Sequence, residues 1–147
     1  MRDARFAEEK GMADIMHLVK IAAPPERVYE ALATTEGIRN WWTRDADLTN
    51  GTGTFRFHDG ADVTTVLIKE LEPPLHVLWK TTTSFRPEWE GTTIAFDLRA
   101  QGNVTVLSFA HRGFEEADER YAVTTTGWGV YLASLQQYLE TGIGSPQ

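Results

Sequence analysis

The chain has 147 residues, of which 41% are hydrophobic and 11% aromatic, and it contains no cysteine. This length fits one domain with a substantial core, and the missing cysteine excludes disulfides, thiolate metal sites and cysteine nucleophiles. The 21 Asp and Glu outnumber the 14 Lys and Arg, which gives a net charge of −7. Because nucleic acids and anionic membranes both attract positively charged surfaces, we expect neither as a partner.

The first residues differ in composition from the rest of the chain. Residues 1–11 are rich in charge and poor in apolar side chains, so we expect a flexible N-terminal arm. They lack the apolar run of a secretion signal, and no window of the chain approaches the ~20 apolar residues of a membrane span. These features predict a cytoplasmic protein without membrane insertion. We expect a single domain at residues 12–140 and a C-terminal tail at 141–147.

The region after the arm begins with a strand and continues with helical signals. Alternating apolar residues predict a strand over residues 14–22, with His17 on the same side as the apolar side chains. A proline pair ends this strand, and Pro25 followed by an acid is typical of a helix start. Gly37 interrupts the helical pattern. Trp41 and its neighbours then predict a second, short helical turn.

The middle of the chain alternates strand-like runs with turn residues at roughly ten-residue spacing, which is typical of an antiparallel meander. The runs fall at residues 53–58, 63–71, 75–82, 92–99 and 104–111. Gly, Pro and Asn residues mark the turns between them. The last two runs predict a hairpin in which Phe96 faces the same side as Phe109 and His111.

Residues 115–140 contain conflicting local signals. Residues 123–126 are β-branched, and Gly127 and Gly129 each cost a helix about 1 kcal/mol. A stripe with helical spacing opposes them, formed by Thr124, Trp128, Tyr131, Leu135, Tyr138 and Leu139. Acids at positions 115, 116, 118 and 119 also suit a helix N-terminus. The pattern predicts one long helix, in which the two glycines are either tolerated weak points or leave space beside Trp128.

A series of short motifs follows one order along the chain. They are Ala23-Pro24-Pro25-Glu26-Arg27-Val28-Tyr29, Trp41-Trp42, Glu72-Pro73-Pro74, His111-Arg112-Gly113-Phe114, Gly127-Trp128 and Tyr138-Leu139-Glu140. In this order and spacing, residues 14 to 140 resemble the activator-of-heat-shock-ATPase-like branch of the START/birch-pollen-allergen superfamily. The resemblance implies an α+β helix-grip fold, in which a curved antiparallel sheet of about six strands surrounds a long C-terminal helix and two short helices follow the first strand. It also implies a cavity for apolar or amphipathic small molecules, and no common catalytic residue.

Aromatic residues give the strongest indication of a binding site. Five tryptophans in 147 residues is a high number, and tryptophan usually packs a large core or lines a site. Within the helix-grip fold, we expect the ligand-binding side chains to be Trp42, Trp79, Phe96, Phe109, His111, Trp128 and Tyr131. The alternative is that these residues only fill the core.

Four histidines are present, and none lies at metal-ligand spacing from another. We therefore predict no metal site and no cofactor. The resemblance implies that the first and last strands are antiparallel neighbours, which would bring His17 close to His111. These two residues are the candidates for a catalytic acid and base, and the alternative is a pair of hydrogen-bonded core histidines.

Catalytic motifs such as G-x-S-x-G, H-E-x-x-H and the P-loop are missing from the sequence. The leading hypothesis is therefore a carrier that binds or sequesters a small hydrophobic or aromatic ligand, and it predicts an apolar cavity lining. An enzyme of the polyketide cyclase/aromatase or hydrolase kind predicts a histidine or carboxylate with a perturbed pKa in a pocket. A co-chaperone-like interaction module predicts a filled interior and an exposed apolar patch. The sequence leaves the oligomeric state open, with a homodimer as one alternative.

Overall fold

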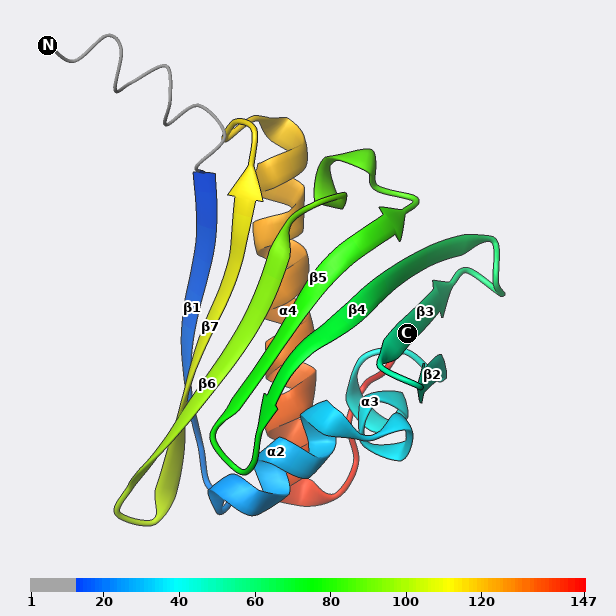
Figure 1. Ribbon diagram of the computed structural model, residues 1–147. Coiled ribbons are helices and arrows are strands. Elements are labelled where there is room, and N and C mark those ends of the chain that lie inside the picture. The colour runs from blue at the N-terminus through cyan, green and yellow to red at the C-terminus, as the bar shows by residue number, and fades with distance from the viewer. Residues whose placement is uncertain (1–12) are drawn as a thin grey trace, which may run out of the picture.

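A computed structural model describes residues 13–147 and shows one antiparallel sheet packed against one long helix (Figure 1). The seven strands lie in the order β1-β7-β6-β5-β4-β3-β2. Their bounds are β1 (Ala13–Ile21), β2 (Asp45–Thr49), β3 (Thr52–Phe57), β4 (Asp62–Glu72), β5 (His76–Ser84), β6 (Thr93–Gln101) and β7 (Val104–Phe114). The predicted α+β helix-grip fold is confirmed. The arm expected at residues 1–11 lies outside the described residues.

Two short helices follow β1, as expected, and a long C-terminal helix covers one face of the sheet. Helix α2 (Pro25–Ala33) begins at the second proline of the pair, and the Thr34 hydroxyl caps α3 (Thr35–Trp41) by accepting the Gly37 N–H at 2.9 Å. A 3-10 turn, η2 (Pro87–Trp89), precedes β6. The long helix α4 (Glu119–Thr141) runs along one face of the sheet (Figure 1). Within residues 13–147, no helix is long and apolar enough to span a membrane.

The strands pair in the register that their alternation predicts. Phe96 on β6 lies opposite Phe109 on β7, and Ile94 lies opposite His111. Strand β1 pairs with the other side of β7 and places His17 opposite Phe109. Since side chains two residues apart share a face, all these residues point to the side that α4 covers, where they form the core.

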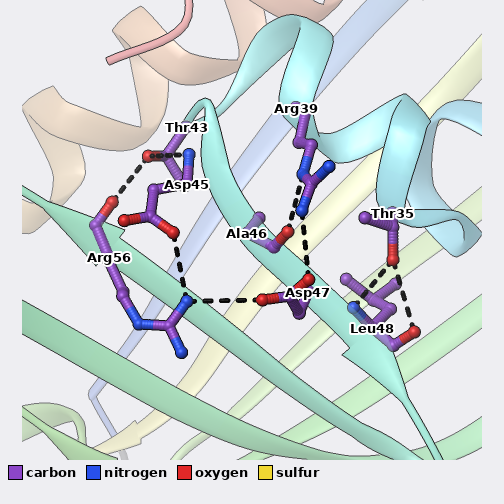
Figure 2. A network of polar contacts seen from close by, with 8 residues as sticks. All are labelled: Thr35, Arg39, Thr43, Asp45, Ala46, Asp47, Leu48 and Arg56. Carbon is purple, nitrogen blue, oxygen red and sulfur yellow. Dashed lines mark hydrogen bonds and ion pairs between the residues drawn. The ribbon is translucent and has the colours of Figure 1, made fainter. Parts of the chain in front are cut away.

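The sheet has one strand more than the six or so expected, because β2 carries little apolar alternation. Its sequence DADLT buries only Ala46. Polar contacts from neighbouring elements hold it instead (Figure 2): Arg39 on α3 donates to the Ala46 carbonyl at 2.8 Å and to the Asp47 carboxylate at 3.0 Å. Arg56 on β3 contacts Asp45 at 3.1 Å and Asp47 at 3.4 Å. The strand therefore depends on residues outside its own segment.

Helix α4 forms over nearly the predicted range despite its β-branched run and its glycines. It begins at Glu119 because the Asp118 carboxylate caps the first turn, accepting the Tyr121 N–H at 3.1 Å. It ends at Gly142, whose φ of 90° suits a helix C-terminus. Burial of its inner side chains, including Trp128 and Leu135, outweighs the weak local propensity.

The residues after α4 fold back onto α3. The Gln147 N–H donates to the Trp42 carbonyl at 2.8 Å, and the Arg44 N–H donates to the Gln147 carbonyl at 3.2 Å. The Ser134 hydroxyl, in α4, accepts the Ser145 N–H at 2.8 Å. The C-terminus consequently lies beside α3 and the short strands β2 and β3 (Figure 1).

Candidate functional site

Aromatic rings from both helices and strands occupy the space between the sheet and α4. Trp42, at the end of α3, lies near the centre of this cluster. Its ring centroid is 4.4 Å from that of Phe55 on β3, 5.2 Å from that of Trp128 on α4 and 6.0 Å from that of Trp79 on β5. Contacts at these separations are favourable for aromatic pairs. The interior is therefore packed with side chains that face one another.

The structure brings the predicted ligand-binding residues together. Six of them are buried at 1% exposure or less, namely Trp42, Trp79, Phe96, Phe109, His111 and Trp128. Tyr131 is only partly buried and packs on the edge of the group, with its ring 5.9 Å from Trp42. Their common location follows from the strand registers and the α4 stripe. Their role in binding a ligand, and the cavity itself, stay predictions because the rings contact each other.

The five indole N–H groups fall into two classes. Three have acceptors: Trp41 donates to the Ala31 carbonyl at 2.9 Å, Trp89 to the Thr124 hydroxyl at 3.1 Å, and Trp128 to His111 at 3.0 Å. The Nε1 atoms of Trp42 and Trp79 are buried and have no hydrogen-bond partner among the described residues. Those two indoles are stacked, with an angle of 10° between their planes. Two unused donors thus lie close together inside the aromatic cluster.

His111 is a fully bonded core residue. Its Nδ1 accepts the Trp128 N–H, which leaves Nε2 to donate to the Thr92 hydroxyl at 2.7 Å. That hydroxyl donates in turn to the Trp89 carbonyl. Burial lowers the pKa of His111 to about 3, so the imidazole is neutral at physiological pH. Both nitrogens are therefore engaged, by Trp128 and Thr92 and not by His17.

His17 has a different environment. It shares the inner face with His111 but is offset along the sheet, since its register partner is Phe109 and its ring lies 6.0 Å from that side chain. Its Nε2 is buried and has no hydrogen-bond partner in the part of the chain that the structure describes. A hollow of about 320 Å³ between β1 and α4 borders it, and Gly129 lines the opposite side. A Cβ atom at Gly129 would meet nothing within 4 Å, so the glycine leaves open space there.

A second hollow lies where the loop after β5 approaches α4. It has a volume of about 460 Å³ and is lined by Arg86, Glu119, Ala122, Val123, Thr126 and Gly127. Tyr131 adjoins it, because a Cβ atom at Gly127 would lie 3.7 Å from the tyrosine ring. Burial raises the pKa of Tyr131, while the charge of Arg86 and the nearby N–H of Trp42, which lies outside hydrogen-bonding geometry with the hydroxyl, act in the opposite direction. Because Tyr131 also packs on the edge of the aromatic cluster, we call this hollow together with Tyr131 the rim of the interior.

One group of side chains has the chemistry of a metal site. Glu70, Glu72 and His76, at the β4–β5 hairpin, have ligand atoms within 4.8 Å of one another, and one imidazole with two carboxylates suits a divalent transition metal. In the structure, the two ring nitrogens of His76 contact the carboxylates of Asp97 at 2.6 Å and Glu70 at 2.8 Å. Burial lowers the pKa of His76, but these hydrogen bonds outweigh it and raise the pKa overall. The spacing of histidines in the sequence could not reveal a group built from carboxylates.

Sequence reasoning missed several residues of the interior and its rim. Trp89 stacks on Trp128 with ring centroids 5.9 Å apart, yet it lies in a loop without apolar alternation. Thr92 and Arg86 also belong to this loop, and their roles depend on contacts with α4 and β7. The one available signal was the concentration of aromatic residues at Phe85 and Trp89.

A curved antiparallel sheet around a C-terminal helix, with an aromatic interior, defines a protein of the helix-grip class. The profile of the family described as "Activator of Hsp90 ATPase homolog 1-like protein" matches residues 22–140. The chain belongs to this family.

Solved structures agree with this assignment. An Aha1 protein of Colwellia psychrerythraea, described as a dimer in solution, is 35% identical, with a TM-score of 0.82 over 90% of this chain and 100% of that chain. SSP2350 from Staphylococcus saprophyticus is 21% identical, with a TM-score of 0.74 over 90% and 96% of the two chains. CalU16 from Micromonospora echinospora is 21% identical, with a TM-score of 0.69 over 91% and 78%. The last two share the fold alone. Among curated proteins, none matches this chain.

Proposed function

We propose that this protein binds a small aromatic or apolar molecule between the sheet and α4, and that it carries or sequesters that molecule. The observation that supports this function is the pair of buried indole N–H groups of Trp42 and Trp79, which have no acceptor within residues 13–147. Leaving a buried donor unpaired costs about 1–3 kcal/mol, and native proteins contain few such groups. A ligand that supplies a hydrogen-bond acceptor would remove this cost.

The surroundings of these two donors set the chemistry of the ligand. Phe55, Phe96 and Trp128 contact one or both indoles through their rings. Such a lining favours a flat, apolar body. A carbonyl or ether oxygen on that body would face Trp42 or Trp79. Because the rings contact each other, entry of the ligand requires that side chains at the rim, such as Tyr131, move aside.

The test compares two neutral probes of the same shape, 2-acetylnaphthalene and 2-ethylnaphthalene, of which only the first has an acceptor oxygen. We expect the ketone to bind about fivefold more tightly, the equivalent of one hydrogen bond of about 1 kcal/mol. In ¹H–¹⁵N spectra, the ketone should shift the indole resonances of Trp42 and Trp79 more than that of Trp41, whose N–H already has an acceptor.

Two variants complete this test. Trp79→Phe keeps an aromatic ring but removes one unpaired donor, and it should reduce the preference for the ketone. Trp41→Phe removes a donor that is bonded outside the aromatic pair, and it should leave the preference intact. If neither probe binds and no indole resonance moves, the proposed function is wrong.

A second candidate function is self-association, and it rests on the outer face of β1. This strand forms one edge of the sheet, and its Met16 and Leu18 side chains are 67% and 62% exposed. Exposed apolar side chains on an edge strand favour contact with another chain, and the Colwellia relative is described as a dimer. We propose that a second copy of this chain covers these residues.

The cytoplasmic location expected from the sequence stays a prediction.

Analytical ultracentrifugation tests the dimer. Leu18→Lys should convert a wild-type dimer into a monomer, because it places a charge in the contact. Leu71→Lys, at a side chain that is 47% exposed on β4, serves as the matched control and should remain dimeric. A monomeric wild type, or a dimer unaffected by Leu18→Lys, would contradict this candidate.

A further inference from the structure

We propose that the rim between Arg86 and Tyr131 binds the acidic group of an aromatic carboxylate, whose ring system enters the aromatic interior. This inference rests on the proposed function, to which it adds the chemical class of the ligand. It depends on three features of the rim: a cation that has no acidic partner among residues 13–147, a hydroxyl beside it and an apolar wall.

The apolar wall is one face of α4. Ala122, Val123 and Gly127 line the hollow of about 460 Å³ opposite Arg86, and Val123 is 49% exposed. Tyr131 follows Gly127 by four residues and therefore continues the same helix face toward Trp42. A ligand lying along this face would extend from the solvent edge to the unpaired indole donors.

Arg86 supplies the cation. Its guanidinium lies 5.2 Å from the centroid of the Phe85 ring, a cation–π arrangement that fixes the side chain at the rim. No carboxylate within residues 13–147 forms an ion pair with it, whereas Arg39, Arg56 and Arg120 all have acidic partners. A partly buried guanidinium without a counter-ion is suited to bind a carboxylate through two parallel hydrogen bonds.

Tyr131 supplies the second donor. Its hydroxyl lies 4.0 Å from where a Cβ atom on Gly127 would be, at the wall of the hollow that Arg86 also lines. Burial raises the pKa of this hydroxyl, although the charge of Arg86 opposes the rise. The phenol is therefore protonated at neutral pH and can donate to an anion. With its ring 5.9 Å from Trp42, Tyr131 connects the cation at the rim with the indole N–H inside.

Glu119 is the one acid among the residues that line this hollow. Its charge opposes an anionic ligand, and its place in the first turn of α4 separates it by three turns of helix from Tyr131. We therefore place the carboxylate toward the Tyr131 side of Arg86. Removing the Glu119 charge should strengthen anion binding and leave the geometry of the rim intact.

The experiment compares 2-naphthoate with 2-acetylnaphthalene, a neutral analogue of similar shape, by calorimetric or fluorescence titration of the full chain. We expect naphthoate to bind at least about tenfold more tightly, because hydrogen bonds between charged groups exceed neutral ones. Arg86→Met should bring the ratio of the two affinities close to one, and Tyr131→Phe should reduce it several-fold. Glu119→Gln should increase it.

Arg99→Gln is the matched control, since Arg99 is exposed on the outer face of β6 and should not affect the ratio. Circular dichroism of each variant checks that the fold is retained. If the ketone binds and naphthoate binds no more tightly than the ketone, this inference is wrong and the proposed function stands. If naphthoate is preferred equally by wild type and Arg86→Met, the acidic group binds elsewhere and the inference also fails. Binding of neither probe overturns both proposals.

Discussion

The buried imidazole of His111 predicts a specific pH dependence of stability. Its pKa is about 3 in the folded protein, because burial disfavours the charged form, and about 6.5 in an unfolded chain. Between these values the unfolded state binds a proton that the folded state does not. The contribution of His111 to the free energy of unfolding is therefore fully present above pH 6.5 and is lost as the pH falls toward 3. At 1.36 kcal/mol per pH unit, acidification from pH 6.5 to 5 should lower the free energy of unfolding by about 2 kcal/mol.

Urea unfolding of wild type and His111→Gln, followed by tryptophan fluorescence at several pH values, measures this effect. Glutamine keeps an acceptor and a donor for Trp128 and Thr92 but does not titrate. The variant should be less stable at pH 7, and its stability should fall by about 2 kcal/mol less than that of wild type between pH 7 and 5. Equal pH dependence in the two proteins would refute the neutral, fully bonded state of His111.

Three further predictions concern local features of the fold. Gly129→Ala should raise stability by about 1 kcal/mol, because the new methyl group meets no atom within 4 Å, and a lower urea midpoint would contradict the open space at this position. His76→Gln should lower the free energy of unfolding by up to about 1 kcal/mol below pH 6.5. This contribution of His76 is lost as the pH rises through its raised pKa, so the urea midpoints of wild type and variant should converge at alkaline pH. Arg39→Ala should remove two hydrogen bonds to β2, costing about 1 kcal/mol. In the Arg39→Ala variant, amide hydrogen exchange should accelerate in β2 and not in β7. Uniform acceleration across the sheet would contradict a local role of Arg39 in holding β2.

Much of the fold could be predicted because local patterns and tertiary contacts agree. Alternation on β6 and β7 predicted which residues face α4, and the structure pairs Phe96 with Phe109 as expected. The stripe on α4 predicted a helix against its β-branched residues, since burial of Trp128 depends on that spacing. Strand β2 escaped prediction for the opposite reason. Its own residues are mostly polar, and arginines from α3 and β3 hold it in place.

The candidate site could be predicted only in part. A surplus of tryptophan indicated an aromatic interior, but no pattern in the sequence tells which indoles find acceptors. That division arises from tertiary neighbours: Trp128 meets His111, and Trp89 meets Thr124. Arg86 was missed because its importance comes from the absence of a described acidic partner and from the face of α4 opposite it.

The distribution of polar bonds divides the interior into two parts with different expected behaviour. Around His111, the donors of Trp128 and Trp89 are satisfied by protein groups, so this part is complete without a ligand and should stay rigid. Around Trp42 and Trp79, two donors have no partner among the residues that the structure describes, and this part lies next to Tyr131 at the rim. A bound molecule can gain the most hydrogen-bond free energy next to donors that the protein itself does not pair. Ligand-induced protection from hydrogen exchange should therefore concentrate at these two indoles, and the His111 side should change little.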